Sequence, residues 1–144
     1  MATAAVLYTP EILGLAAGLA DFPQDLSLPF VGSARSKSCG SHLTLQLAVG
    51  DFGQITRLGI SAQACAIGQA ATTVFARAAG GRSAADIAAA ESGIVAWLAG
   101  EGAMPDWPGL AAIAPAAAYP GRHGAILLAW RAALVALSCV TSLG

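Results

Sequence analysis

The sequence predicts an α+β domain in which a three-stranded antiparallel sheet packs against four to five helices. Three observations predict this class. Apolar residues recur at helical spacing near the start of the chain, alternate with polar residues between positions 28 and 63, and return to helical spacing afterwards. The chain of 144 residues has the length of one compact domain, which we place at residues 1–144.

The first helix is predicted from Val6 to Ala20. Thr9 suits the N-cap position, because its hydroxyl can accept a hydrogen bond from a free backbone N–H. Pro10 suits the first helical position, and Glu11 suits the first turn. These residues together fix where the helix should begin.

Three strands are predicted to form a meander after this helix. The first begins at Phe30 and runs into Ser38, and the second contains Leu43, Leu45 and Leu47. The third begins with Ile55 to Ile60, within an alternating stretch that reaches residue 63. The segments CGS at 39–41 and GDFG at 50–53 connect them, since glycine and aspartate suit the backbone of tight hairpin turns.

Three further helices should cover one face of the sheet. They are predicted from Cys65 to Ala78, from Ser83 to Leu98, and from His123 to about Cys139. Between residues 100 and 121 the helical spacing is lost and prolines gather, which predicts a structured loop. We expect Trp107 to anchor this loop on the core rather than to bind a ligand.

The composition excludes several classes of function. Hydrophobic residues make up 56% of the chain, charged residues make up 10%, and the formal net charge is -1. A chain without excess basic residues cannot neutralise a phosphate backbone, so no nucleic-acid partner is expected. The sequence also lacks paired carboxylates, a Ser-His-Asp order and a glycine-rich phosphate loop. These absences exclude a hydrolase or a nucleotide enzyme. The expectation for the protein as a whole is that it is not itself an enzyme.

The mean hydropathy of +0.67 is high, which raises the question whether one of the long apolar runs could span a membrane. Charged residues interrupt both long apolar runs, Asp86 and Glu91 in the first and Arg131 in the second. We therefore expect no membrane span. The first residues lack the basic region of a signal peptide, and the expected compartment is the cytoplasm.

Three residues that bind metals well stand at ends of predicted elements: Cys39, Cys65 and His123. The ends of the first and third strands share one edge in a meander, and the start of a helix can cap that edge. Two thiolates and an imidazole would then suit zinc or an iron–sulfur centre. Ser41, His42, water or a partner's side chain could supply the fourth ligand.

Each candidate also has a structural alternative. Cys65 can be a small buried residue at the start of a helix, and His123 can bond to neighbouring backbone. His42, at the start of a strand, can be a solvated side chain. Cys139 follows His123 by sixteen residues, about 24 Å along a continuous helix, and cannot join the other thiols.

Four segments spread over nearly the whole chain carry a family resemblance. LYTPEIL, ARSKSCGSHLTLQLAVGDFGQITRLG, ACAIGQAATTVF and GRHGAILLAWRAAL resemble the iron–sulfur cluster assembly scaffold family of the IscU, SufU and NifU amino-terminal type. Cys39 and Cys65 stand at the first two cysteine positions of that family, and His123 stands at the site histidine of the IscU type. The long stretch that contains MPDWPGL resembles the SufU spacing.

The resemblance implies a scaffold that receives sulfur from a cysteine desulfurase. It would bind iron or a labile [2Fe–2S] cluster and transfer the cluster to acceptor apoproteins. Cys39 and Cys65 would accept sulfur and, with His123, hold the metal. Tyr8 lies in a segment that the family uses to contact the desulfurase, although packing the first helix on the sheet is an equal alternative.

The sequence departs from the family at two ligand positions. Ser41 replaces an aspartate, and Gly124 replaces the third cysteine. AYPGRHG stands where the IscU type carries the L-P-P-V-K segment recognised by its chaperone, so a chaperone is an optional further partner. Two alternatives follow: a zinc-bound acceptor of persulfide sulfur like SufU, and a module without metal that regulates the desulfurase.

Basic residues near the candidate site predict a charged rim. Arg35, Lys37 and Arg122 can give this edge a positive potential that attracts an acidic partner or holds thiolates, whereas a solvated face is the alternative.

Overall fold

The computed structural model describes residues 7–143 of the chain and the side chains of residues 7–140. Its three strands are β1 (Phe30–Arg35), β2 (His42–Val49) and β3 (Ile55–Gln63). Its helices are α2 (Pro10–Gly18), α3 (Ala66–Ala79), α4 (Ala84–Leu98) and α5 (His123–Leu143). Three short 3₁₀ segments are η1 (Leu19–Asp21), η2 (Leu110–Ala118) and η3 (Pro120–Arg122).

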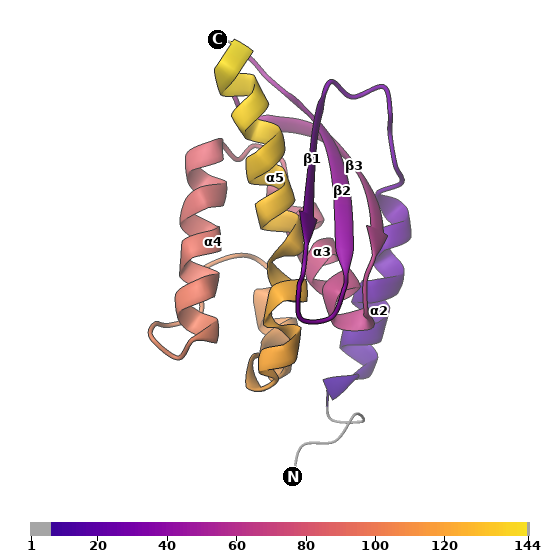
Figure 1. Cartoon of the computed structure of the whole chain (residues 1–144), viewed down its shortest axis with the longest axis vertical. Helices are drawn as coiled ribbons and strands as arrows, with labels where there is room; N and C mark the ends of the chain where they lie inside the picture. Colours follow the sequence, from indigo (N-terminus) through magenta and orange to yellow (C-terminus); the bar gives the residue numbers. More distant parts are fainter. Residues whose placement is uncertain (1–6, 144) are drawn as a thin grey trace.

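The sheet is an antiparallel meander in the order β1-β2-β3. Helix α5 packs on β1 and β2, α3 packs on β3 and α5, and α2 and α4 flank these two helices (Figure 1). Side chains alternate along β2, so Leu43, Leu45 and Leu47 are buried against the helices. The predicted α+β class with a three-stranded meander is confirmed.

The start of each helix shows the local chemistry that the sequence predicts. The backbone N–H of Ile12 donates to the Thr9 hydroxyl over 3.1 Å, with Pro10 at the first helical position. Ser83 caps α4 in a capping box with Asp86, in which each side chain accepts a hydrogen bond from the other's backbone N–H. The N-cap of α3 is Cys65.

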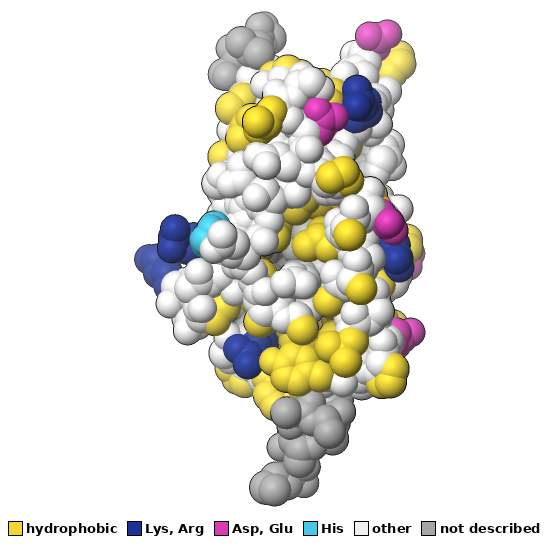
Figure 2. Space-filling view, turned by 90° about the vertical axis from the view of Figure 1, so that its right-hand side faces the viewer, with side chains coloured by type: hydrophobic (Ala, Val, Ile, Leu, Met, Phe, Trp, Pro, Cys, Tyr) yellow, Lys and Arg dark blue, Asp and Glu magenta, His cyan; other side chains and the backbone are white. Residues whose placement is uncertain are grey.

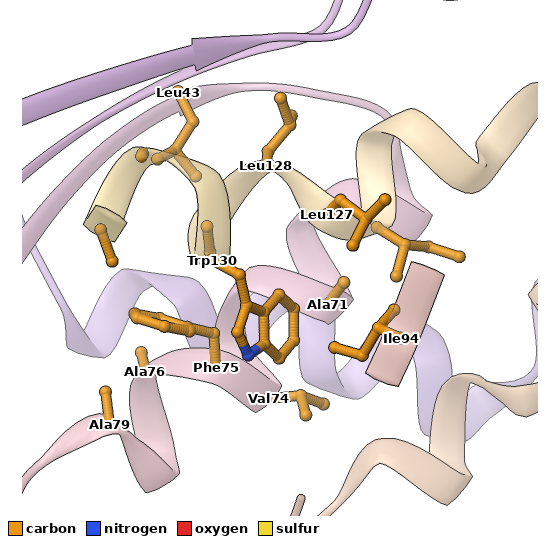
Figure 3. Close-up of a cluster of buried hydrophobic side chains, with 14 of the residues drawn as sticks. Leu43, Ala71, Val74, Phe75, Ala76, Ala79, Ile94, Leu127, Leu128 and Trp130 are labelled. Carbon is orange, nitrogen blue, oxygen red and sulfur yellow. The ribbon is translucent and has the colours of Figure 1, made fainter. Parts of the chain in front are cut away.

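Three aromatic rings join the long loop to the centre of the core. Figure 3 shows Trp130 of α5 pointing toward Phe75 of α3, and the two ring centroids are 5.3 Å apart at an interplanar angle of 77°. Trp107 stacks on Phe75 at 5.6 Å, and its indole N–H donates to the Val74 carbonyl over 3.0 Å. Trp107 therefore anchors the loop, as predicted.

One glycine allows α5 to approach the sheet closely. A Cβ at Gly32 of β1 would collide with the backbone of Ala132 and of Ala136. Gly32 is therefore required where the strand crosses the helix, because any side chain would push the two elements apart.

The last helix was expected to be too interrupted to span a membrane. By length and composition alone, however, the segment from Pro120 to Val140 is able to do so, with Arg131 inside it. In this fold 56% of its most apolar window is buried inside the protein. Burial against the sheet and two neighbouring helices accounts for the apolar composition of this segment.

Several predicted boundaries are corrected by the structure. Strand β1 ends at Arg35 rather than Ser38, because residues 36–41 close a turn in which the Ser36 N–H donates to the Ser41 carbonyl over 2.8 Å. Helix α5 continues to Leu143 rather than ending at about Cys139, whereas β3 ends at Gln63, where the alternating stretch of the sequence also ends. The loop at 100–121 contains η2 and most of η3, and the predicted helix start at Val6 lies outside the described residues.

Candidate functional site

Three segments that carry the candidate residues meet at one end of the molecule. The register pairs His42 of β2 with Gln63 of β3, so the turn before β2 and the start of α3 share one edge of the sheet. The start of α5 lies at the same end (Figure 1). Helix α5 comes close to the turn at Gly124, where an added Cβ would lie 2.5 Å from the Ser36 oxygen.

Cys39 is exposed at the tip of the turn between β1 and β2. The turn closes through the Gly40 N–H, which donates to the Ser36 carbonyl over 3.0 Å. Gly40 has a φ of 71°, a backbone conformation that side chains other than glycine rarely adopt. The CGS segment therefore reverses the chain, as predicted, and the Cys39 thiol in it is exposed to solvent.

Two buried hydroxyl groups contact the sulfur of Cys39. The Ser36 oxygen lies 3.5 Å from Sγ, and the Ser41 oxygen lies 3.0 Å from it. The Ser36 and Ser41 hydroxyl groups lower the pKa of Cys39, with smaller contributions from the Ser41 backbone and the positive charge of Arg122. A hydroxyl can donate to a thiolate, so this arrangement favours the nucleophilic form of the side chain.

Cys65 is half-buried and lies at the N-terminus of α3. Its backbone is extended, with φ -64° and ψ 169°, and its carbonyl accepts the first helical hydrogen bond from the Gln69 N–H over 2.9 Å. Its thiol makes no capping hydrogen bond to the helix. Cys65 is therefore a second thiol at the same end of the sheet as Cys39.

His123 is half-buried at the start of α5 and contacts neighbouring backbone. Its Nε2 lies 2.7 Å from the Ala117 carbonyl oxygen. A carbonyl can only accept, so Nε2 carries the proton in this contact, and Nδ1 is the ring nitrogen left to bind a metal.

Ser41 and His42 have different surroundings. Ser41 is buried, and its hydroxyl is directed to the Cys39 sulfur. His42 precedes the buried Leu43 in β2, so its side chain lies on the opposite face of the sheet and is half-buried there. The Nδ1 atom of His42 is itself buried and has no hydrogen-bond partner. Of the two candidate fourth ligands, Ser41 is the one that touches a cysteine.

The structure does not join the candidate ligands into a complete metal site. Among residues 7–140, no three His, Cys, Asp or Glu side chains are grouped so that they could hold one metal ion. Cys139 is exposed far along α5, and its sulfur lies 3.8 Å from the Val135 carbonyl oxygen. The assignment of Cys39, Cys65 and His123 as metal ligands stays a prediction.

Ser36 and Ser38 are contacts of the site that the sequence interpretation missed. The two hydroxyl oxygens lie 3.2 Å apart, and Ser38 also donates to the Gly121 carbonyl over 3.2 Å. The bond from Ser38 joins the Cys39 turn to η3, which directly precedes α5. The available signal was the repeated serine in the segment SKSCGS, although sequence spacing alone does not show which hydroxyl faces the thiol.

Basic side chains surround this end of the molecule. Arg35 and Lys37 are exposed on either side of Ser36. The positive charge of Arg122 contributes to the lowered pKa of Cys39, and its guanidinium donates to the Tyr8 hydroxyl over 3.3 Å. No Asp or Glu occurs between residues 26 and 50 or between residues 107 and 144. The predicted positive rim therefore has no carboxylate partner from the sheet segment or from the last helix.

A pocket of about 410 Å³ adjoins this rim. Its lining includes Leu7, Tyr8, Tyr119, Pro120 and Arg122. Figure 2 shows hydrophobic side chains gathered at the lower end of the molecule, with a basic side chain beside them. The arrangement combines an exposed thiol, a cationic group and an apolar surface.

Comparison of the sequence with family models and with curated proteins gives no match. Solved structures do match. A nitrogen-fixing NifU-like protein from Brucella abortus, in its N-terminal part, superimposes with a TM-score of 0.87 and 28% identity, covering 96% of this chain and 97% of that chain. The fold is that of NifU-like proteins.

A second solved structure has the same fold. A protein from Fervidobacterium islandicum AW-1, described as an iron–sulfur cluster assembly scaffold for that system, superimposes with a TM-score of 0.79. It is 21% identical and covers 94% of this chain and 99% of its own. The predicted resemblance to the IscU, SufU and NifU type is confirmed by these two structures.

Proposed function

We propose that this NifU-like protein is a scaffold of iron–sulfur cluster assembly that receives its sulfur at Cys39 from a cysteine desulfurase. The observation that carries this proposal is the exposed Cys39 sulfur held between the Ser36 and Ser41 hydroxyl groups. A solvent-accessible thiol with a lowered pKa has the properties that a sulfur acceptor needs.

The transfer step is a thiol exchange. The Cys39 thiolate attacks the terminal sulfur of a persulfide on the desulfurase cysteine. A bond forms between that terminal sulfur and Cys39, the sulfur–sulfur bond on the desulfurase breaks, and the desulfurase cysteine leaves as a thiolate. Cys39 then carries the persulfide, and the Ser36 and Ser41 hydroxyl groups remain within reach of its sulfur.

Iron and the cluster are the cargo of the proposed scaffold. Cys39 and Cys65 are the two thiols that would bind iron or a [2Fe–2S] cluster, and His123 could contribute only through Nδ1. Conversion of the persulfide to sulfide needs two electrons, which an external electron donor would have to supply. The completed cluster would pass to acceptor apoproteins by exchange of ligands, in the cytoplasm.

The first experiment measures sulfur transfer. The protein is incubated with a cysteine desulfurase of the SUF type and cysteine, and the gain of one sulfur atom is followed by mass spectrometry. We expect transfer to the wild type, loss of transfer in Cys39→Ser, and normal transfer in the matched control Cys139→Ser, whose thiol is also exposed. Equal transfer to Cys39→Ser and the wild type would reject Cys39 as the acceptor.

The second experiment measures the cargo. Anaerobic reconstitution with iron and sulfide is followed by visible absorbance and metal analysis on wild type, Cys39→Ala, Cys65→Ala and His123→Ala. A sulfur-to-iron absorbance lost in the cysteine variants supports cluster binding. One zinc per chain that depends on the same residues would instead favour the zinc-bound sulfur acceptor. Binding of neither metal, without sulfur transfer, would favour the regulatory module.

A further inference from the structure

Ser36 occupies the space between the Cys39 turn and the start of α5. Its side chain is buried, with 4% of the residue exposed. Its oxygen lies 3.5 Å from the sulfur of Cys39 and 3.2 Å from the oxygen of Ser38. The hydroxyl is thus surrounded by the turn on one side and by the helix on the other.

Gly124 is the residue of α5 that faces this hydroxyl. A Cβ at position 124 would lie 2.5 Å from the Ser36 oxygen and 3.3 Å from the Ser36 Cβ. The first distance is shorter than real Cβ contacts allow, and the second is tight. Any side chain at position 124 would therefore compete with Ser36 for the same volume.

We infer that Ser36 closes the position from which residue 124 would otherwise contribute a third ligand, so that Ser36 and Gly124 together specify a site with two thiols. The inference rests on the proposed function for its meaning, because position 124 matters only if this end of the fold handles sulfur or iron. Its physical content, the competition for volume, is independent of that function.

The closed position at residue 124 limits the ligands that a bound cluster can find. A cluster held by Cys39 and Cys65 cannot obtain a third thiolate from α5 while Ser36 is in place. Its remaining ligands must come from another atom of this chain, such as His123 Nδ1, or from a second molecule. Ser36 therefore limits which atoms can complete the coordination of a metal at this site.

A double-mutant cycle tests the competition for volume. Gly124→Ala is expected to lower the midpoint of thermal unfolding by about 5 °C, because overpacking a closed site is destabilising. In the Ser36→Gly background the same change should lower the midpoint far less. Alanine for glycine normally stabilises a helix, so the sign of the change is itself informative. Ser38→Gly is the matched control and should not rescue Gly124→Ala, since the Ser38 oxygen is 3.6 Å from the Cβ position.

Cobalt(II) tests the ligand position directly. Ser36→Gly combined with Gly124→Cys should bind Co²⁺ with a thiolate-to-cobalt absorbance that is lost when Cys39→Ser is added. Gly124→Cys alone should show much weaker absorbance. Two results would overturn the inference. In the first, Gly124→Ala and Gly124→Cys are as stable as the wild type. In the second, Gly124→Cys alone binds Co²⁺ as well as the combined variant does. Sulfur transfer to wild-type Cys39 is measured separately, so its failure would reject the proposed function and leave the packing result standing.

Discussion

The hydroxyl oxygen of Ser41 lies 3.0 Å from the sulfur of Cys39, and the Ser36 hydroxyl approaches the same sulfur from 3.5 Å. The sequence resemblance to the IscU, SufU and NifU type places an aspartate at the position of Ser41, so in this chain a neutral hydroxyl stands next to the thiol instead of a negative charge. A carboxylate would oppose the thiolate by charge repulsion, whereas a hydroxyl can donate a hydrogen bond to it. This replacement favours a reactive cysteine.

The first prediction concerns the pH dependence of Cys39. The hydroxyl groups of Ser36 and Ser41 lower its pKa, so Ser36→Ala and Ser41→Ala should each raise the pH at which alkylation reaches half its maximal rate. The measurement uses a chain whose remaining thiol is Cys39, made by Cys65→Ser and Cys139→Ser. Unchanged midpoints in both alanine variants would contradict the role of the hydroxyl groups.

The same shift fixes the sign of a stability effect. The pKa of Cys39 is lower in the folded chain than in the unfolded chain. The Cys39 thiolate therefore stabilises the folded chain at high pH. This contribution is complete above the pKa of the unfolded chain and is lost as the pH falls through the pKa of the folded chain. Urea unfolding of the wild type and of Cys39→Ser across the alkaline range should show the two stabilities diverging upward with pH.

The second prediction concerns the positive rim. Arg35→Glu together with Lys37→Glu should slow sulfur transfer from an acidic desulfurase by about tenfold at low ionic strength, and added salt should reduce the difference. The matched control compares Arg35→Glu alone with Arg77→Glu, which also reverses one exposed charge. Arg77 is on α3, where its side chain lies next to Gly18 of α2 and away from Cys39. An equal loss in the control would show that total charge, rather than its position, governs the encounter.

The third prediction separates the two possible roles of His123. Glutamine can place its amide nitrogen near the position of the histidine Nε2, so His123→Gln should keep the hydrogen bond to the Ala117 carbonyl while removing Nδ1. His123→Ala loses both and should cost about 1 kcal/mol of unfolding free energy. If His123 is a ligand, reconstitution should fall in both variants. Normal reconstitution in His123→Gln would leave His123 with a structural role.

The fourth prediction concerns the aromatic anchor. Trp107→Ala should lower the free energy of unfolding by about 3–5 kcal/mol, because a buried indole and its packing on Phe75 are lost. Trp107→Phe removes the hydrogen bond to Val74 but keeps a ring, and should cost about 1 kcal/mol from that bond. Urea unfolding provides the measurement. Phe52→Ala, at a side chain that is 91% exposed, is the control and should change stability little.

The fold could be predicted because its signals are local. Thr9 with Pro10 marks the start of α2, Ser83 with Asp86 marks the start of α4, and alternation of the leucines marks β2. The extent of β1 was overestimated, because the sequence does not show that the Ser36 backbone pairs with Ser41 across the turn. Likewise, the sequence shows that α5 is apolar but does not show that neighbouring elements bury most of its most apolar window.

The sequence by itself determined the three-stranded α+β fold, the turn that presents Cys39 and the absence of a cysteine at position 124. Only the tertiary structure decided that Ser36, rather than an empty space, faces Gly124, and that the Nε2 of His123 is engaged by backbone. The physical reason is that helix starts and hairpin turns follow from neighbouring residues. The contents of the space between a turn and a distant helix follow from how the whole chain packs.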